Sequence, residues 1–372
     1  MKVCVLGTHS FGGDGPKVGT QHIAETLARD GHEVYYVTSQ VSFLTLLSGE
    51  HRAKYLSEPR RLADRLFQLT PASLLPMRTI ALLEGSFLEP LAMRLNRAVE
   101  RTRSRLLERT LFDLCIFSAA GSMTLLPRIR ARRYIYRHND VLAKFERVPP
   151  SLLQFERRLL RHHPIWRVCS VNEALAESLR TIYPDLPIKV VPNGIDCALF
   201  RTAEPDPDLL RTRSSNVVFV GVFDFWTDVD LIVATASVLT DHSFHLFGKW
   251  NRPVPAAIPG NVHIHGPIRH RAAVAKMKAC SVGLIPSGPR NAGRLVARPL
   301  KFYEYLAAGL GVAATSYAGK GLEPFAVLGD TPEALAEAIL RAKSVPETFA
   351  AEIETALREL DWHCIVEQML AE

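Results

Sequence analysis

The sequence lacks most features that mark secreted, membrane-spanning or metal-binding proteins. Its six cysteines are scattered singly with no C-x-x-C pair, which argues against a disulfide framework and a cysteine-based metal site. No run approaches eighteen uninterrupted apolar residues, and the first apolar run is too short for a secretion signal. These absences predict a cytoplasmic protein without a membrane-spanning helix.

Two short motifs are also missing. The loop "GTHSFGGDGPKVGT" follows the first apolar run but does not spell G-x-G-x-x-G, so a dehydrogenase-type dinucleotide site is poorly supported. The D-x-D sequence at 206–208 lies in a linker-like segment rather than beside a strand. No metal site is therefore expected.

Positive charge is concentrated in the first half of the chain. Residues 1–200 contain 28 Lys and Arg against 19 Asp and Glu, whereas residues 201–372 contain 17 against 19. A basic half suggests an anionic partner, either a nucleic acid or an acidic membrane surface. No nucleic-acid motif accompanies it, which favours the membrane. The alternative is that the arginines simply lie on solvated helix faces.

Short apolar runs alternate with helical patterns along the whole chain. Such alternation is typical of a doubly wound parallel sheet, and the rhythm starts afresh near residue 216. The sequence therefore predicts an α/β protein with two Rossmann-like halves. The expected strands are at residues 2–7, 33–39, 114–119, 133–137, 167–172, 216–223, 243–248, 262–266, 281–286 and 311–316.

A Pro-, Asp- and Ser-rich segment, 190–215, separates the two halves. We therefore expect one domain over 1–198, a second over 199–360, and a C-terminal helix over 361–372 that crosses back to the first domain. Within the first domain, residues 66–109 combine Leu- and Phe-rich stretches with an arginine-studded helical pattern. This segment either lies on a membrane or is an amphipathic helix that covers a sheet.

The most informative stretch is "RPLKFYEYLAAGLGVAATS", residues 298–316. It predicts a helix that begins near Pro299 after a buried strand and ends at Gly309. A helix N-terminus beyond the carboxyl end of a strand favours phosphate, and Lys301 would add a full charge there. Glu304 lies one turn further on the same face, where a carboxylate can accept hydrogen bonds from a ribose. The alternative is an exposed ion pair between the two side chains.

This stretch resembles the nucleotide-binding signature of GT-B glycosyltransferases, P-x-K-x-x-E-Y-x-A-x-G. Segments at 190–196, 217–224 and 266–287 follow the order that this family implies. Within it, the chain resembles most closely the bacterial glucuronosyltransferases of xanthan-type exopolysaccharide assembly. That family has Gln at the position of Glu304. Retaining GT-B enzymes have Glu at the position of Val296, so the stereochemical outcome is left open.

The resemblance implies a glycosyltransferase that moves a sugar, with glucuronate as the candidate, from a UDP-linked donor to a lipid-linked or membrane-proximal acceptor. The first domain would bind acceptor and membrane on the inner face of the plasma membrane, and the second the donor. No cofactor is expected besides the nucleotide-sugar substrate, and no nucleic-acid partner. The alternatives are a nucleotide-sugar epimerase and a GT-B-like binding protein that has lost catalysis.

Candidate site residues follow from this resemblance. A transfer with inversion needs a carboxylate that removes a proton from the acceptor. Asp140, after a strand that carries Tyr136 and Arg137, matches the family's Tyr-Arg-x-x-Asp base; the alternative is a helix cap. The expected donor-binding residues are Lys301, Glu304, Gly221, Ile268 and Arg298. Gly221 would let the backbone approach a phosphate, Ile268 lies where relatives hold the base, and Arg298 would screen the diphosphate.

Overall fold

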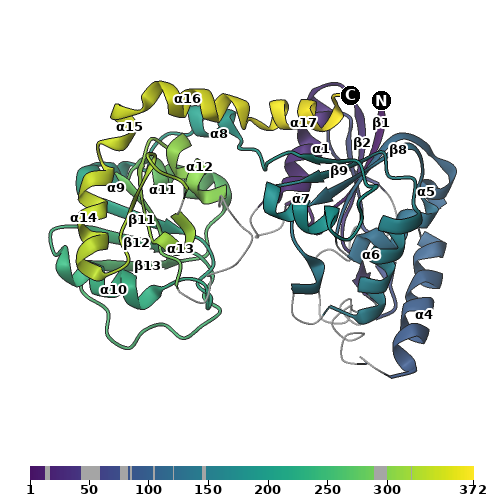
Figure 1. The fold of residues 1–372 in the computed structure, drawn as a ribbon, viewed down its shortest axis with the longest axis horizontal. Helices are drawn as coiled ribbons and strands as arrows, with labels where there is room; N and C mark the ends of the chain where they lie inside the picture. The colour runs from purple at the N-terminus through teal and green to yellow at the C-terminus, as the bar shows by residue number, and fades with distance from the viewer. Residues whose placement is uncertain are drawn as a thin grey trace. The chain divides into compact units, whose positions relative to one another are not determined.

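The computed structural model describes residues 1–12, 17–42, 59–75, 83, 86–103, 105–119, 121–144, 148–288, 300–319 and 321–372. Contacts between Cα atoms divide the chain into two compact units. Unit 1 comprises Met1–Pro192 and Val366–Glu372, and unit 2 comprises Asn193–Ile365. Figure 1 shows the elements of both units, and each unit is described by itself.

Unit 1 is built on an eight-stranded sheet with the order β10-β9-β8-β7-β1-β2-β5-β4. All neighbours pair in parallel except β4 and β5, which are antiparallel. A separate parallel pair joins β3 and β6. The strands are β1 Lys2–Leu6, β2 Glu33–Val37, β3 Val41–Ser42, β4 Arg60–Ala63, β5 Leu66–Leu69, β6 Ala72–Ser73, β7 Leu111–Ser118, β8 Arg130–His138, β9 Arg167–Ser170 and β10 Ile188–Val190.

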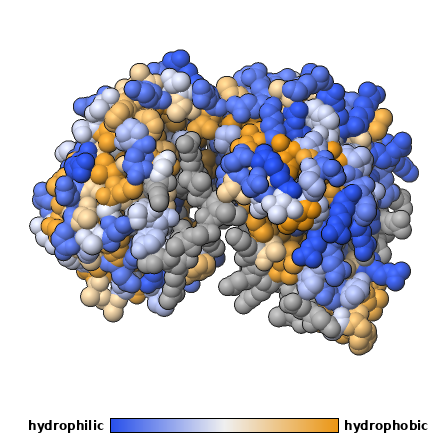
Figure 2. All heavy atoms as spheres, in the orientation of Figure 1, coloured by the Kyte–Doolittle hydropathy of each residue, from blue (hydrophilic) through white to orange (hydrophobic). Residues whose placement is uncertain are grey.

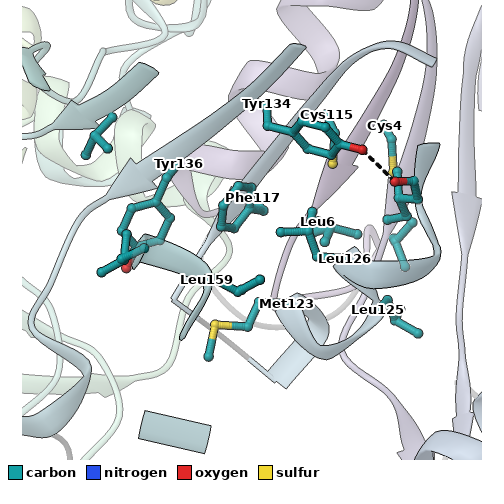
Figure 3. Packing of buried hydrophobic residues seen from close by; sticks show 14 of the residues in the cluster. Cys4, Leu6, Cys115, Phe117, Met123, Leu125, Leu126, Tyr134, Tyr136 and Leu159 are labelled. Carbon is teal, nitrogen blue, oxygen red and sulfur yellow. Dashed lines mark hydrogen bonds between the residues drawn. The ribbon is translucent and has the colours of Figure 1, made fainter. Parts of the chain in front are cut away.

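Apolar side chains of the central strands form the core of unit 1. Figure 3 shows Leu6, Phe117 and Leu126 among the side chains of this cluster, and all three are almost fully buried. The dashed line marks the 2.7 Å hydrogen bond that the Tyr134 hydroxyl donates to the carbonyl oxygen of Ile129. The helices of unit 1 are α1 Gly19–Arg29, α4 Leu88–Arg103, α5 Arg105–Arg109, η2 Gly121–Arg128, η3 Leu142–Lys144, α6 Pro150–His162 and α7 Glu173–Arg180.

Unit 2 contains a fully parallel six-stranded sheet with the order β13-β12-β11-β14-β15-β16. The central strands β11, β14 and β15 read as nearly continuous apolar runs because helices cover both faces of such a sheet, whereas the edge strand β13 is largely exposed. The strands are β11 Asn216–Val220, β12 Ser243–Phe247, β13 Val262–Gly266, β14 Val282–Ile285, β15 Gly311–Ala314 and β16 Ala326–Leu328.

The helices of unit 2 pack their apolar faces on this sheet, with Ile232 of α10 and Ile339 of α14 fully buried in one cluster. The last helix, α17, begins in unit 2 and ends in unit 1, where the Met369 carbonyl accepts a 2.9 Å hydrogen bond from Arg167. The helices are α8 Cys197–Thr202, α9 Pro207–Leu210, η4 Arg213–Ser215, α10 Val229–Val238, α11 His270–Lys278, α12 Leu300–Ala307, α13 Ser316–Gly319, α14 Pro332–Ala342, α15 Val345–Thr348, α16 Ala350–Glu359 and α17 Trp362–Leu370.

The predicted α/β class with two doubly wound sheets is confirmed. In unit 1 the chain runs outward from β1 through β2 and then restarts at β7 on the other side; in unit 2 it does the same from β11 and β14. Each sheet therefore has a switch point, where ligands of such folds bind beyond the carboxyl ends of the strands. Among the described helices, none combines the length and apolarity needed to span a bilayer.

Candidate functional site

The helix α12 lies directly against the switch point of unit 2. Gly283 in β14 makes room for it, since a Cβ there would lie 2.3 Å from the ring of Tyr305. The Tyr305 hydroxyl in turn accepts a 3.1 Å hydrogen bond from the backbone N–H of Val220 in β11. The predicted glycine stop is confirmed, because Gly309 has a φ of +76° just after the helix. Tyr305 thereby fixes α12 beside β11 and β14.

Lys301 reaches from the first turn of α12 back to the end of β11. Its Nζ lies 4.0 Å from the ring centroid of Phe219, and a Cβ on Gly221 would lie only 2.4 Å from that nitrogen. Burial lowers the pKa of Lys301 to about 8, although Glu304 acts to raise it. The alternative of an exposed ion pair is wrong, because the ammonium group lies against an aromatic ring and the backbone of Gly221. A cation in such a place gains from an added anion.

Glu304, one turn further along α12, is hydrogen-bonded to the start of α11. Its Oε1 lies 2.9 Å from Nε2 of His270, and each side chain is about one-fifth exposed. The two predicted residues Lys301 and Glu304 thus lie at one end of one helix, with the ammonium directed to β11 and the carboxylate to α11. This arrangement offers a cation and an oriented acceptor in adjacent positions.

Three glycines end the neighbouring strands at the same edge of the sheet. Gly221 follows β11 and its N–H donates to the Phe247 carbonyl at 2.9 Å; Gly248 follows β12 and donates to the carbonyl of Gly266 at 2.7 Å. Gly248 has a φ of +147°, and a Cβ there would lie 1.5 Å from the carbonyl oxygen of Gly221. The backbone of these strand ends is partly exposed, and only glycine leaves it without a covering side chain.

The other predicted donor residues are less well placed by the structure. Ile268 lies two residues beyond β13 and two before α11, at the same carboxyl edge, and is half-buried. Arg298 lies outside the described residues, as do Arg290 and Arg294. The roles of Ile268 and Arg298 stay predictions.

In unit 1, the predicted base Asp140 is exposed and lies two residues beyond the end of β8. The residues of its motif have structural contacts. Arg137 is almost fully buried and donates hydrogen bonds to the carbonyls of Val191 at 2.5 Å and Pro192 at 2.7 Å, the last residues before unit 2. Tyr136 donates to the Glu156 carboxylate at 2.5 Å. These contacts fix the strand end that carries Asp140.

His138 lies between Arg137 and Asp140 and is buried, which makes it a weak base. Burial, with a contribution from Arg137, lowers its pKa to about 4, so the ring is neutral at pH 7. Its Nδ1 lies 3.1 Å from the hydroxyl oxygen of Ser170. The assignment of Asp140 as the base stays a prediction.

Sequence reasoning missed two residues of the site, His270 and Gly248. His270 is the first residue of α11, and its contact with Glu304 joins residues 34 positions apart. Gly248 directly follows the apolar run of β12. A glycine at the end of a strand is the one sequence feature that could have indicated a close approach of backbone there.

Comparison with known proteins bears on both units. Residues 5–169 match the family model described as glucuronosyltransferase GumK, N-terminal domain. No curated protein sequence matches the chain significantly.

Several solved structures share the fold of the whole chain. Sucrose-phosphate synthase from Thermosynechococcus elongatus is 15% identical with a TM-score of 0.66, covering 99% of this chain and 97% of that one. HepE from Anabaena, in complex with UDP-glucose, is 15% identical with a TM-score of 0.59 and coverage of 100% and 98%. WaaG, a glycosyltransferase involved in lipopolysaccharide biosynthesis, is 15% identical with a TM-score of 0.57 and coverage of 98% and 98%.

These matches agree with the resemblance drawn from the motifs. The structural similarity extends over both units, and the family match covers most of unit 1. Residues 5–169 are thus similar to the N-terminal domain of the GumK glucuronosyltransferases, and the whole chain shares the fold of sucrose-phosphate synthase, HepE and WaaG.

Proposed function

We propose that this enzyme transfers a sugar, with glucuronate as the candidate, from a UDP-linked donor to a lipid-linked or membrane-proximal saccharide. The observation that carries the proposal is the Lys301 ammonium group, held against the backbone of Gly221 at the switch point of unit 2. The match to glucuronosyltransferases over residues 5–169 supports the choice of sugar.

The chemistry of the site suits a nucleoside diphosphate. The N-terminus of α12 and Lys301 supply positive charge for the diphosphate, and Glu304 can accept hydrogen bonds from the ribose. As the β-phosphate leaves the sugar, the same cation would stabilise the charge that develops on it. Because these groups supply the positive charge, we propose that transfer requires no metal ion.

The donor is tested by a thermal-shift panel of UDP, GDP, the sugar conjugates of both, and NAD. Turnover of the best donor is then measured with EDTA present, which tests whether transfer needs a metal ion. We expect UDP and UDP-glucuronate to raise the melting temperature and NAD to have no effect. Stabilisation by NAD as well as by UDP would instead favour a nucleotide-sugar epimerase.

Asp140 is the proposed general base in unit 1. Replacing it with asparagine removes the proton acceptor while keeping the shape of the side chain, so kcat should fall about 100- to 10,000-fold. The donor affinity should be unchanged, because the donor residues belong to unit 2. Steady-state kinetics with UDP release as the readout, together with calorimetric titration of UDP, would separate the two quantities.

The matched control is Asp185→Asn, because Asp185 is another exposed carboxylate of unit 1. It should leave kcat within about twofold. If Asp140→Asn keeps wild-type kcat, Asp140 is not the base; if it lowers kcat only because the fold is damaged, the melting temperature will fall with it.

The acceptor side is proposed to face an anionic membrane through α4. The buried face of this helix is fixed by Asn96, which exchanges hydrogen bonds of 2.8 and 2.9 Å with the backbone of Leu75, and by Glu89, which accepts one of 3.0 Å from the N–H of Ser151. Beside this buried face lies an apolar stripe that is open to solvent, comprising Phe87 just before α4 and Leu88, Leu91 and Leu95 within it.

Exposure along this stripe is high for apolar side chains, reaching 84% at Phe87, and apolar atoms gather at the lower end of α4 in Figure 2. The helix sequence also carries four arginines, and the first 200 residues of the chain carry excess positive charge. An apolar stripe on a basic helix is typical of binding to the surface of anionic bilayers.

Replacing both Leu91 and Leu95 with aspartate should weaken vesicle binding at least tenfold, because two apolar anchors are lost and two negative charges are added. Binding is measured by co-sedimentation with vesicles of phosphatidylcholine mixed with phosphatidylglycerol. The control is Ile182→Asp, which changes an exposed apolar residue of unit 1 outside α4. Equal binding of all three proteins would refute the role of α4.

A further inference from the structure

His270 is the one side chain that an ion-pair distance joins to Glu304 among the described residues of unit 2. The distance between His270 Nε2 and Glu304 Oε1 is 2.9 Å. A carboxylate can only accept a hydrogen bond, so this ring nitrogen carries the proton and donates. The contact therefore directs one carboxylate oxygen of Glu304 to α11.

The histidine ring is itself held in place by α8. It packs edge-on against the ring of Phe200, with the centroids 6.4 Å apart, and Phe200 is almost fully buried. At the other end of α11, Lys278 donates hydrogen bonds to the carbonyls of Phe200 at 2.9 Å and Ala203 at 2.6 Å. Contacts at both ends of α11 thus fix it to α8, and His270 has a defined position from which to orient the carboxylate.

An oriented carboxylate discriminates between sugars of the nucleotide. With Oε1 engaged by His270, Oε2 is the oxygen of Glu304 that remains to accept a hydrogen bond from a bound nucleotide. A ribose has a hydroxyl at C2′ that can donate to this oxygen, whereas a deoxyribose has only hydrogen there. Without that hydroxyl, an oxygen oriented toward C2′ would lose its solvent partners on binding and find no donor at that carbon.

We propose that His270 is a positioning residue that holds Glu304 for the 2′-hydroxyl, and that the enzyme takes ribonucleoside diphosphate sugars and rejects deoxyribonucleoside ones. The inference rests on the proposed donor site and adds to it the donor class, UDP-linked as opposed to dTDP-linked. His270 acts on this choice through Glu304 and does not itself contact the ribose.

The test compares the affinities of UDP and 2′-deoxy-UDP, which differ only in the hydroxyl, by calorimetric titration of the full chain. For the wild type we expect UDP to bind at least about tenfold more tightly. In His270→Leu this ratio should fall close to one, because UDP binding weakens while 2′-deoxy-UDP binding stays within about twofold. His270→Gln should restore the ratio, because its amide nitrogen can donate to Glu304.

His162→Leu is the control, because His162 is an exposed histidine at the end of α6 in unit 1. Its ratio should equal that of the wild type. A wild type that binds UDP without preference over 2′-deoxy-UDP would overturn this inference and leave the donor site standing. Equal losses of both ligands in His270→Leu would show a merely structural role and overturn it too. A wild type that binds neither ligand would overturn the proposed function itself.

Discussion

Replacing Lys301 with methionine should lower the affinity for UDP about 100-fold. The ammonium group lies against Gly221 at the switch point, where a bound diphosphate would be largely removed from water. Truncating one partner of such a charge pair costs about 3 kcal/mol, which corresponds to that factor. Methionine keeps most of the length of the side chain and its contact with Phe219, so the change is confined to the charge. Calorimetric titration with UDP measures it.

The same substitution should stabilise the free protein. Burial lowers the pKa of Lys301 to about 8 in the folded state, below its value in the unfolded chain, so the fold disfavours the charged form. The loss of folding stability caused by the buried charge is fully present below pH 8. It disappears as the pH rises from 8 to the pKa of lysine in the unfolded chain. Removing the charge should raise the free energy of unfolding at pH 7 by about 1–3 kcal/mol, the upper value being reduced by residual contact with water.

The pH dependence of binding gives an independent signature. Only the protonated amine attracts the diphosphate, so wild-type affinity for UDP should fall about tenfold per pH unit above 8, and affinity in Lys301→Met should be flat there. Lys2→Met, which alters a lysine of unit 1, is the control and should behave as the wild type. A variant that loses stability together with affinity would contradict the account, because it would show that Lys301 supports the fold.

Most of the fold is predictable because buried parallel strands have continuous apolar sequences. The runs at β1, β2, β7, β11 and β12 are of this kind, and each forms a strand in the structure. The short strands β4, β5, β10 and β16 were not foreseen. β4 is a polar edge strand, "RRLA", that exists through antiparallel pairing with β5. Nothing local in such a sequence distinguishes it from a loop.

The sequence predicts the spacing of site residues within one helix, but not their contacts with residues of other elements. The spacing of Lys301 and Glu304 places them one turn apart in α12, because helical geometry alone decides it. The direction of each side chain depends on Phe219 and His270, which come from other elements far away in the sequence. Likewise, the motif match at Arg137 could not reveal that its guanidinium holds Val191 and Pro192.

Replacing Gly248 with alanine should lower the free energy of unfolding of unit 2 by more than about 4 kcal/mol. Losses of this size result only from severe defects in the core or the backbone. Its φ of +147° is unfavourable for any residue with a Cβ, and the added carbon would lie 1.5 Å from the carbonyl oxygen of Gly221. Neither backbone can easily move away, because Gly248 donates to Gly266 and Gly221 donates to Phe247. Soluble yield and chemical denaturation measure the loss.

Gly260→Ala is the matched control in the same unit, since a Cβ there meets no atom within 4 Å. It should be neutral, or stabilising by up to about 0.5 kcal/mol, because it restricts the unfolded chain. If Gly248→Ala is as stable as this control, the ends of β11 and β12 do not approach as described. The bare backbone edge beside Lys301 would then be absent, and with it the physical reason for placing a diphosphate there. A large loss at Gly248 alone would instead show that the ends of β11 and β12 approach so closely that only glycine is tolerated there.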